Sequence, residues 1–211
     1  MKEYKLPIGC DVPETIILAD GDFPSHPLAL EWLRQCPYVV CCDGAANTYI
    51  RSGRMPEAIV GDGDSLLPDI KERYASLIHS EAEQETNDLS KAFRFCLSQE
   101  RKRITIMGAT GKREDHTIGN VSLLADYMEQ AEVSMMTDYG IFVPIRGDSM
   151  FESYIGQQIS VFNMNSTALS AEGLAYPLSV FTNWWQGTLN EALARHFIIR
   201  TEGKVLVFRV F

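Results

Sequence analysis

Short apolar runs that each end in a polar turn recur along the first two thirds of the chain. The clearest runs cover residues 15–19, 38–42, 58–60 and 104–107, and stretches with helical spacing of apolar residues separate them. Strands that alternate with helices predict a mostly parallel sheet with helices on both faces. Ligands bind beyond the carboxyl ends of the strands in such sheets, so we expect the turns that follow these runs to meet at one edge.

The pattern changes after Asp138. Only one weak helical stretch, at residues 189–193, interrupts a series of short β-rich runs. These runs cover residues 141–148, 157–163, 197–201 and 204–211. We therefore expect an α/β domain over residues 1–137 and an all-β, sandwich-like domain over residues 138–211. The second domain is near the size at which a lone hydrophobic core is marginal, which favours association with another subunit.

Composition narrows the class of protein. The net charge is -9, from 19 basic and 28 acidic residues, whereas a general nucleic-acid binder carries a basic surface. The N-terminus lacks the apolar region of a signal peptide, and no apolar run reaches membrane-spanning length. The five cysteines show no C-x-x-C spacing, so a zinc site is not indicated. We expect a cytoplasmic protein that binds neither nucleic acid nor membrane.

The third apolar run ends in two aspartates, Asp62 and Asp64, with Gly61 and Gly63 beside them. Carboxylates one residue apart, just past a buried strand, suit Mg²⁺, because this ion prefers oxygen ligands and shares them with substrate phosphates. The glycines allow a ligand to approach the backbone closely. The alternative is a polar turn without a ligand, since Gly, Asp and Ser are favoured in turns.

A second polar cluster stands where a strong helical pattern begins. It contains Asn87 and Asp88, and Lys91 follows one helical turn later. Helix capping alone explains an Asn or Asp at this position, with a stabilisation of about 1 kcal/mol. The alternative is that Asp88 is a third metal ligand beside Asp62 and Asp64.

A glycine-rich segment, residues 108–120, lies between a predicted strand and a predicted helix. Its glycines, Lys112 and Arg113 are suited to bind an anion, because backbone N–H groups and a helix N-terminus favour phosphate. The segment matches neither the Walker loop nor the G-x-G-x-x-G fingerprint. Asp115 and His116 could equally be a helix cap and a surface histidine.

An aromatic segment in the β-rich half contains Thr182, Asn183, Trp184 and Trp185. Either indole could belong to the core, or one of them could stack on a flat heterocycle. If the segment is extended, the two indoles point in opposite directions. We expect Trp184, directly after Asn183, to face a ligand.

Taken in order, these clusters resemble the thiamine pyrophosphokinase family. The segment at residues 108–120 is the most specific part, since it is similar to the family's G-x-x-G-G-R-x-D-H-x-x-x-N. The other matching parts are Asp43-Gly44-Ala45, Gly61 to Ser65, Asn87-Asp88, Gly173 to Leu178 and Thr182-Asn183. The sequence departs from the family pattern at Gly63, where Phe is common, at Asn87 and Thr182, where Thr and Ser are common, and at Lys112, where Gly is common.

The resemblance implies a Mg²⁺-dependent transfer of pyrophosphate from ATP to the hydroxyl of thiamine, with release of AMP. It also implies an N-terminal nucleotide-binding catalytic domain, a C-terminal domain for thiamine binding and dimerisation, and a homodimer with shared active sites. Two alternatives remain open: the same reaction on another heterocyclic alcohol of the pterin type, or a nucleotide sensor without turnover.

The resemblance also gives an expected role to individual residues. The catalytic residues are Asp62, Asp64, Asp88 and Asp115, and the metal ligands are Asp62, Asp64 and Asp88. The ATP-binding residues are Asp43, Gly44, Gly61, Gln84, Asn87, Lys91, Gly111, Lys112 and Arg113. The thiamine-binding residues are Thr182, Asn183 and Trp184.

Overall fold

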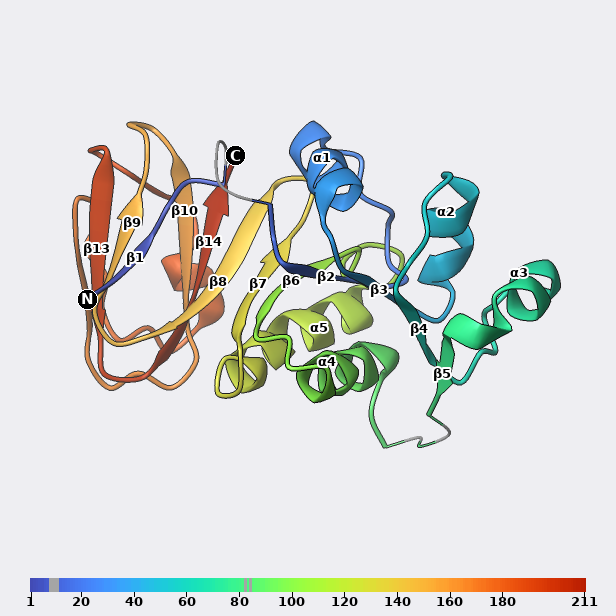
Figure 1. The fold of residues 1–211 in the computed structure, drawn as a ribbon. Helices are drawn as coiled ribbons and strands as arrows, with labels where there is room; N and C mark the ends of the chain where they lie inside the picture. Colours follow the sequence, from blue (N-terminus) through green and yellow to red (C-terminus); the bar gives the residue numbers. More distant parts are fainter. Residues whose placement is uncertain (8–11, 82, 84) are drawn as a thin grey trace. The chain divides into compact units, whose positions relative to one another are not determined.

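The computed structural model describes residues 1–7, 12–81, 83 and 85–211 (Figure 1). The chain forms two compact units. An α/β unit consists of Val12–Leu123 and Glu129–Asp138, and a C-terminal unit consists of Met1–Asp11, Leu124–Met128 and Tyr139–Phe211. Within the described residues, no helix is both long and apolar enough to cross a membrane.

The α/β unit contains a parallel sheet in the order β7-β6-β2-β3-β4-β5. Every pairing between these neighbours is parallel. The strands are β2 (Thr15–Leu18), β3 (Val39–Cys42), β4 (Ala58–Gly61), β5 (Ile78–Ser80), β6 (Arg103–Met107) and β7 (Glu132–Met136). The three central strands β2, β3 and β4 are buried along their whole length, as expected for a sheet covered on both faces.

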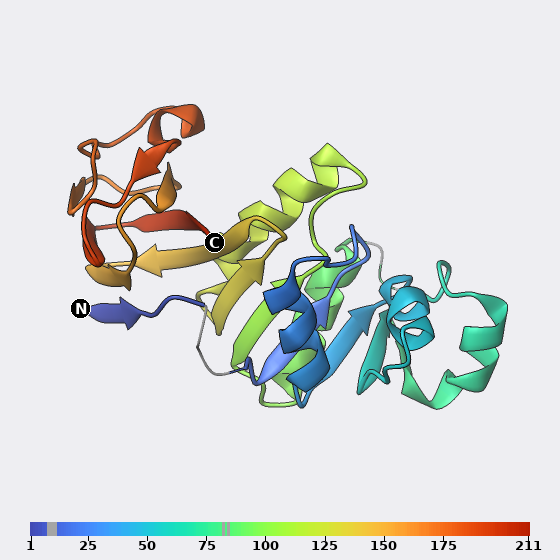
Figure 2. The same cartoon turned by 90° about the horizontal axis from the view of Figure 1, so that it is seen from above.

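Helices cover both faces of this sheet, as the sequence predicts. In Figure 1, α1 and α2 lie above the sheet and α4 and α5 lie below it, and Figure 2 shows α1 and α2 in front of the strands. The helices are α1 (Pro27–Gln35), α2 (Ala45–Arg51), α3 (Pro68–Arg73), α4 (Asp88–Ser98) and α5 (Glu114–Tyr127), with a 3₁₀ turn η1 (Ala75–Leu77) after α3. Side chains such as Phe93 of α4 are fully buried and complete the core.

The strand order reverses between β2 and β6. From β2 the chain adds β3, β4 and β5 toward one edge, and it then returns to add β6 and β7 on the other side of β2. The loops that follow β2 and β6 therefore leave in opposite directions and open a crevice at the carboxyl ends of the strands, which is where ligands bind in sheets of this type.

The C-terminal unit is a β-sandwich. One sheet has the order β1-β9-β13-β11, and the strands β12-β10-β14-β8 form the other layer. The strands are β1 (Lys2–Tyr4), β8 (Gly140–Arg146), β9 (Ser149–Glu152), β10 (Gln158–Asn163), β11 (Leu169–Glu172), β12 (Asn190–Glu191), β13 (His196–Thr201) and β14 (Lys204–Val210).

The core of the sandwich lies between the inner faces of its two layers. Phe151 and Phe197 stack with ring centroids 5.0 Å apart, and they share one apolar cluster with Val161 and Val207 from the other layer. Alternate residues along β13 are buried, as the period of a strand with one core-facing side requires. The predicted β-rich second half is thus confirmed.

Two features of the C-terminal unit differ from the expectation. The helix predicted at residues 189–193 is wrong: Asn190–Glu191 form strand β12, and Leu189 has a φ of 62°, which no α-helix contains. The helical turn lies earlier, as the 3₁₀ segment η2 (Trp184–Gly187). In addition, the first strand, β1, pairs in parallel with β9 and so belongs to the sandwich, although residues 1–137 were expected to form the α/β domain.

Candidate active site

A cavity of about 440 Å³ lies in the α/β unit at the carboxyl ends of the strands. It begins at the end of β2, with Asp20 and Gly21, and includes Cys42 from the end of β3. Its wall also contains seven residues that the sequence predicts for the site: Asp62, Asn87, Asp88, Lys91, Gly111, Lys112 and Arg113. The polar turns that follow separate strands therefore converge, as the parallel sheet requires.

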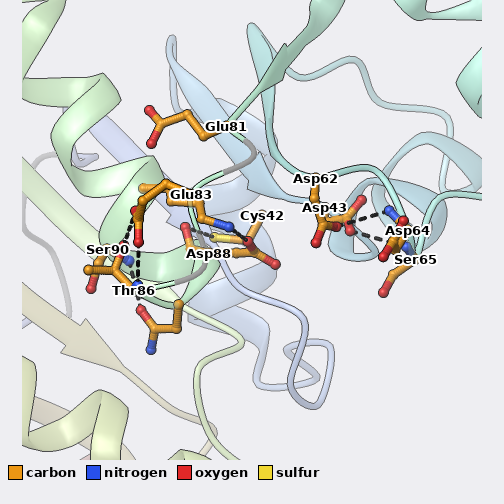
Figure 3. A network of polar contacts seen from close by, with 12 residues as sticks. Cys42, Asp43, Asp62, Asp64, Ser65, Glu81, Glu83, Thr86, Asp88 and Ser90 are labelled. Carbon is orange, nitrogen blue, oxygen red and sulfur yellow. Dashed lines mark hydrogen bonds and ion pairs between the residues drawn. The ribbon is translucent and has the colours of Figure 1, made fainter.

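Asp43 is a buried carboxylate beside this cavity. Its side chain is 3% exposed, and its Oδ2 accepts a hydrogen bond from Ser65 N at 3.1 Å. No donor among the described residues reaches its buried Oδ1. Burial raises the pKa of Asp43, and the charges of Asp88 and Asp62 raise it further. Figure 3 shows Asp43 next to Asp62, so two carboxylates lie together where a cation would relieve their repulsion.

Asp62 and Asp64 do not face the same space. Asp62 lies in the cavity wall, and its Oδ1 accepts a hydrogen bond from Asp64 N at 3.1 Å. Asp64 is exposed and lies outside the described wall, on the Ser65 side of the turn in Figure 3. The carboxylates that this conformation brings near one another are those of Asp43, Asp62 and Asp88.

Gly44 and Gly61 allow the acidic turns to approach one another closely. A Cβ atom at Gly61 would lie 2.8 Å from the Cβ of Asp43, and one at Gly44 would lie 2.7 Å from Oδ2 of Asp20. Neither glycine belongs to the described cavity wall. Glycine is therefore needed at both positions for a structural reason that is independent of the predicted ATP contact.

The start of α4 combines helix capping with a charged pair. Asn87 is the N-cap, and its Oδ1 accepts a hydrogen bond from Ser90 N at 2.9 Å, whereas Asp88 is the first residue of the helix. Lys91 is 3% exposed and donates to Asp88 Oδ1 at 3.0 Å. Burial opposes the charged form of Lys91, but the hydrogen bond and charge of Asp88 raise its pKa overall. Asn87 thus caps the helix, and Asp88 lies in the cavity wall with a buried ammonium beside it.

The glycine-rich loop after β6 has left-handed backbone at three positions. Gly108, Gly111 and Lys112 have φ values of 64°, 80° and 56°. A Cβ atom at Gly108 would lie 2.6 Å from the carbonyl oxygen of Ala19, so the loop packs directly on the end of β2. The ammonium of Lys112 forms an ion pair with Asp20 Oδ1 at 3.1 Å, and both side chains are about half exposed (54% and 46%).

Arg113 and Asp115 pair with each other at the start of α5. The guanidinium donates from Nε to Asp115 Oδ1 at 3.0 Å and from Nη2 to Oδ2 at 2.5 Å. The hydrogen bonds from Arg113 hold the pKa of Asp115 below its usual value. Arg113 belongs to the cavity wall and Asp115 lies outside its described part. In this arrangement Asp115 orients an arginine of the wall.

The donor set of the cavity fits a hard cation. Carboxylate oxygens are the ligands that Mg²⁺ prefers, and the buried Oδ1 of Asp43 has no donor among the described residues. Among the described residues, no group of three or more His, Cys, Asp or Glu side chains is already arranged to hold a metal ion. This fits an ion that takes one or two carboxylates and completes its shell with water and phosphate. Gln84, predicted to contact ATP, lies outside the described residues.

In the C-terminal unit, the predicted thiamine-binding residues lie at the start of η2. Asn183 is the N-cap of η2, and Gln186 Oε1 accepts from Thr182 N at 3.1 Å and from Asn183 N at 2.9 Å. Trp184 is 43% exposed and meets Phe162 edge-on, with ring centroids 6.0 Å apart. Trp185 is 73% exposed. The alternative that both indoles belong to the core is wrong, and the segment is a 3₁₀ turn, not an extended strand.

Sequence reasoning missed several residues of the cavity wall, including Asp20, Thr86, His116 and Asn120. Asp20 could have been found, because it follows an apolar run in the same way as the acidic turns after β3 and β4. Asn120 could also have been found, because it is the last position of the pattern matched by residues 108–120. Thr86 carries no comparable signal, since its place in the wall depends on how the start of α4 meets α5.

A parallel sheet with a cavity at its switch point, acidic turns and a glycine-rich loop is typical of proteins that bind phosphorylated ligands. The family model for the thiamin pyrophosphokinase catalytic domain matches residues 29–136, and the model for the substrate-binding domain matches residues 140–208. The chain belongs to the thiamin pyrophosphokinase family.

Individual relatives agree with this assignment. Thiamin pyrophosphokinase 1 of Caenorhabditis elegans is 26% identical over 190 residues, which cover 82% of this chain and 74% of the relative. Thiamine pyrophosphokinase 1 of Oryza sativa subsp. japonica is 30% identical over 129 residues. The chain spans about half the length of this rice protein, 49%.

Solved structures of the family share the fold. Thiamin pyrophosphokinase from Candida albicans superposes with a TM-score of 0.80 at 19% identity, covering 100% of this chain and 93% of the other. Thiamine pyrophosphokinase from Bacillus subtilis gives a TM-score of 0.77 at 21% identity, covering 93% of this chain and 98% of the other. At these identities the similarity shows a shared fold, which combines an α/β unit with a β-rich unit.

Proposed function

We propose that this protein transfers pyrophosphate from ATP to the hydroxyl of thiamine, giving thiamine pyrophosphate and AMP. One observation carries the proposal: the acidic residues Asp62 and Asp88 and the basic residues Lys112 and Arg113 lie in the wall of one cavity, at the switch point of a thiamin pyrophosphokinase fold. Acidic groups for a metal and basic groups for phosphates are the two requirements of a site for a metal-bound triphosphate.

Mg²⁺ would be held by Asp62 and Asp88, with Asp43 beside them, and Asp64 remains a predicted ligand. When bound, the ion would supply positive charge to offset the negative charge that develops as the bond to AMP breaks. The protein supplies the rest of the environment: the buried ammonium of Lys91 balances part of the acidic wall, and Lys112 and Arg113 bind phosphate oxygens.

The transfer step is a substitution at phosphorus, with no oxidation or reduction. The hydroxyl oxygen of the acceptor attacks the β-phosphorus, the bond between this phosphorus and the oxygen of the α-phosphate breaks, and AMP leaves with the bonding electrons. The hydroxyl proton passes to a carboxylate of the acidic wall. Asp115 contributes by holding Arg113, to which it is joined by two hydrogen bonds.

Thiamine would be bound by Thr182, Asn183 and Trp184. The amide of Asn183 offers a donor and an acceptor to the aminopyrimidine edge, and an exposed indole attracts the cationic thiazolium. The exposure of Trp184, at 43%, supports a surface role over a core role.

A homodimer with shared active sites is also expected, and the C-terminal unit supports it. The C-terminal unit exposes several large apolar side chains that a symmetric interface would bury: Tyr176, Trp184, Trp185, Leu189 and Leu193. Sedimentation at micromolar concentration should give about twice 23.7 kDa, and a species of 23.7 kDa would reject the dimer. The cytoplasmic location stays a prediction.

The reaction is tested by AMP release from ATP and Mg²⁺, with thiamine present or omitted. Release that needs both thiamine and Mg²⁺ is the expected result. Release with a pterin-type alcohol, but not with thiamine, would change the acceptor and keep the fold. Nucleotide binding without AMP release under any of these conditions would favour a sensor.

A further inference from the structure

Two side-chain amides connect three segments that meet at the cavity. Asn87 at the start of α4 donates from Nδ2 to Oδ1 of Asn120 on α5, at 3.2 Å. Asn120 donates in turn from Nδ2 to the carbonyl oxygen of Ala109, at 2.9 Å. Asn87, Asn120 and Ala109 all belong to the cavity wall.

The direction of this chain of hydrogen bonds is set at both ends. Ser90 N is a donor, so Asn87 must present Oδ1 to it, and the Nδ2 group of Asn87 is then left for Asn120. The carbonyl of Ala109 is an acceptor, so Asn120 must present Nδ2 to it and Oδ1 to Asn87. Each amide therefore has one consistent orientation, which a hydroxyl or a carboxylate would not reproduce.

Capping alone does not require an amide at position 87. A threonine, which is common at this position in the family that the sequence resembles, can also accept a hydrogen bond from Ser90 N. The shorter threonine side chain has no second group that would bond to Asn120. The second bond, from Asn87 to Asn120, joins the segment that carries Asp88 to the segment that begins the glycine-rich loop.

We infer that Asn87 and Asn120 are positioning residues that fix the acidic wall relative to the glycine-rich loop before the nucleotide arrives. The inference rests on the proposed function, because it assumes that both walls bind the same triphosphate. A site that is already arranged loses less conformational freedom when its ligand binds. Loss of the bridge should therefore weaken nucleotide binding more than it slows turnover at saturation.

The main test is the variant Asn87→Thr, which keeps the helix cap and removes the bridge. Binding of α,β-methylene-ATP with Mg²⁺ is measured by calorimetry, because this analogue blocks the bond that the reaction breaks. We expect the Kd to rise about three- to tenfold, the range for one partly exposed hydrogen bond. The melting temperature should stay near that of the wild type, and the KM for ATP should rise more than kcat falls.

Asn120→Ala tests the bridge from its other end. Combined with Asn87→Thr, it should weaken binding no more than Asn120→Ala alone, since Asn120→Ala already removes the hydrogen bond from Asn87. Asn87→Ala, which removes cap and bridge together, should lower the melting temperature as well. Gln99→Ala is the matched control: it removes an amide at the opposite end of α4 and should leave the Kd and melting temperature unchanged.

The outcomes separate the two hypotheses. If the wild-type protein does not bind the analogue, the proposed nucleotide site is wrong. If the wild type binds but Asn87→Thr binds equally well, the proposed site stands and the positioning role is wrong. Fully additive effects of Asn87→Thr and Asn120→Ala would also contradict the bridge.

Discussion

The acidic turns of the α/β unit and the aromatic segment of the C-terminal unit were both singled out by their sequence, yet they are built differently. Asp43, Asp62 and Asp88 follow three different parts of the chain and meet beside one cavity, where burial and mutual repulsion act on them. Trp184 and Trp185 lie on a short 3₁₀ turn with much of their surface exposed.

This difference separates two kinds of functional residue. The aspartates are held near one another by the sheet, and the repulsion that Lys91 leaves unbalanced would be removed by a bound cation. The indoles are placed by a local turn, whose capping hydrogen bonds involve Asn183 and Gln186. We therefore expect removal of the Asp62 charge to alter chemistry without loss of stability, and changes to the indoles to alter recognition.

The largest effect is expected for Asp62→Asn and Asp88→Asn. Each should reduce turnover roughly 100-fold or more, because a ligand that holds the metal on the phosphates is lost. The melting temperature of Asp62→Asn without metal should be unchanged or higher, since one of several like charges is removed. Steady-state kinetics and thermal unfolding measure the two quantities.

Asp64→Asn sharpens this prediction, because Asp64 lies outside the described cavity wall. The sequence predicts that it also holds Mg²⁺, and the same loss of turnover is expected. Near-normal activity of Asp64→Asn together with inactive Asp62→Asn would limit the metal ligands to the residues of the wall.

The next effect concerns the aromatic segment. Trp184→Ala should raise the thiamine KM about two- to thirtyfold, the range of a lost cation–π contact. A fall of a few degrees in melting temperature is compatible with this role, because Trp184 also packs on Phe162. Trp185→Ala is the control, with a ring that is 73% exposed. If only Trp185→Ala changes the thiamine KM, the assignment of Trp184 is wrong.

Asp138 provides the opposite case, an aspartate with donors instead of like charges around it. Its carboxylate accepts hydrogen bonds from Ser25 N and His26 N at 2.9 Å, and from the Ser25 hydroxyl. Burial tends to raise its pKa, but these hydrogen bonds lower it overall. Asp138→Asn should therefore destabilise the protein by about 1–2 kcal/mol at pH 7 and leave the KM for ATP unchanged.

The pH dependence of this effect has a definite sign. A lowered pKa in the folded state means that the stabilisation by Asp138 is fully present above the ordinary aspartate pKa, about 4, and is lost as the pH falls through the lowered value. Urea unfolding of wild type and Asp138→Asn should thus show a difference that is constant near neutral pH and shrinks in acid. A difference that grows in acid would contradict the assignment.

The sequence was sufficient to predict the elements that repeat a simple rule. Apolar runs that end in Asp or Gly predicted the strands of the sheet, and the parallel order then placed Asp62 and Asp88 at one edge. The first strand was missed because Lys2–Tyr4 has three residues, too few for a pattern, and its partner β9 lies in the far half of the chain.

The remaining differences arise from interactions that no local pattern encodes. Trp184 and Trp185 lie in a segment of mixed polarity, so its sequence was equally compatible with an extended chain and with a 3₁₀ turn. The capping box formed by Asn183 and Gln186 stabilises the 3₁₀ turn. The side-chain direction of Asp64 and the bridge from Asn87 to Asn120 depend on tertiary contacts. The sequence could thus predict which turns meet, but not which atoms face one another.

The smallest effect is expected for Lys112→Gly, which tests the glycine-rich loop. Lys112 has a φ of 56°, which costs a residue with a Cβ atom about 1 kcal/mol relative to glycine. Its half-exposed ion pair with Asp20 offsets less than about 1 kcal/mol of this strain. Lys112→Gly should therefore be slightly more stable than the wild type, by about 0.5 kcal/mol.

Lys112→Ala separates the strain at this position from the charge. It removes the ammonium but keeps the Cβ atom, so it should be no more stable than the wild type, whereas its KM for ATP should rise as much as that of Lys112→Gly. Urea unfolding gives the stabilities, and initial rates at varied ATP give the KM values. Equal stability of the two variants would show that the left-handed backbone at Lys112 is not strained, and an unchanged KM in both would remove Lys112 from the phosphate site.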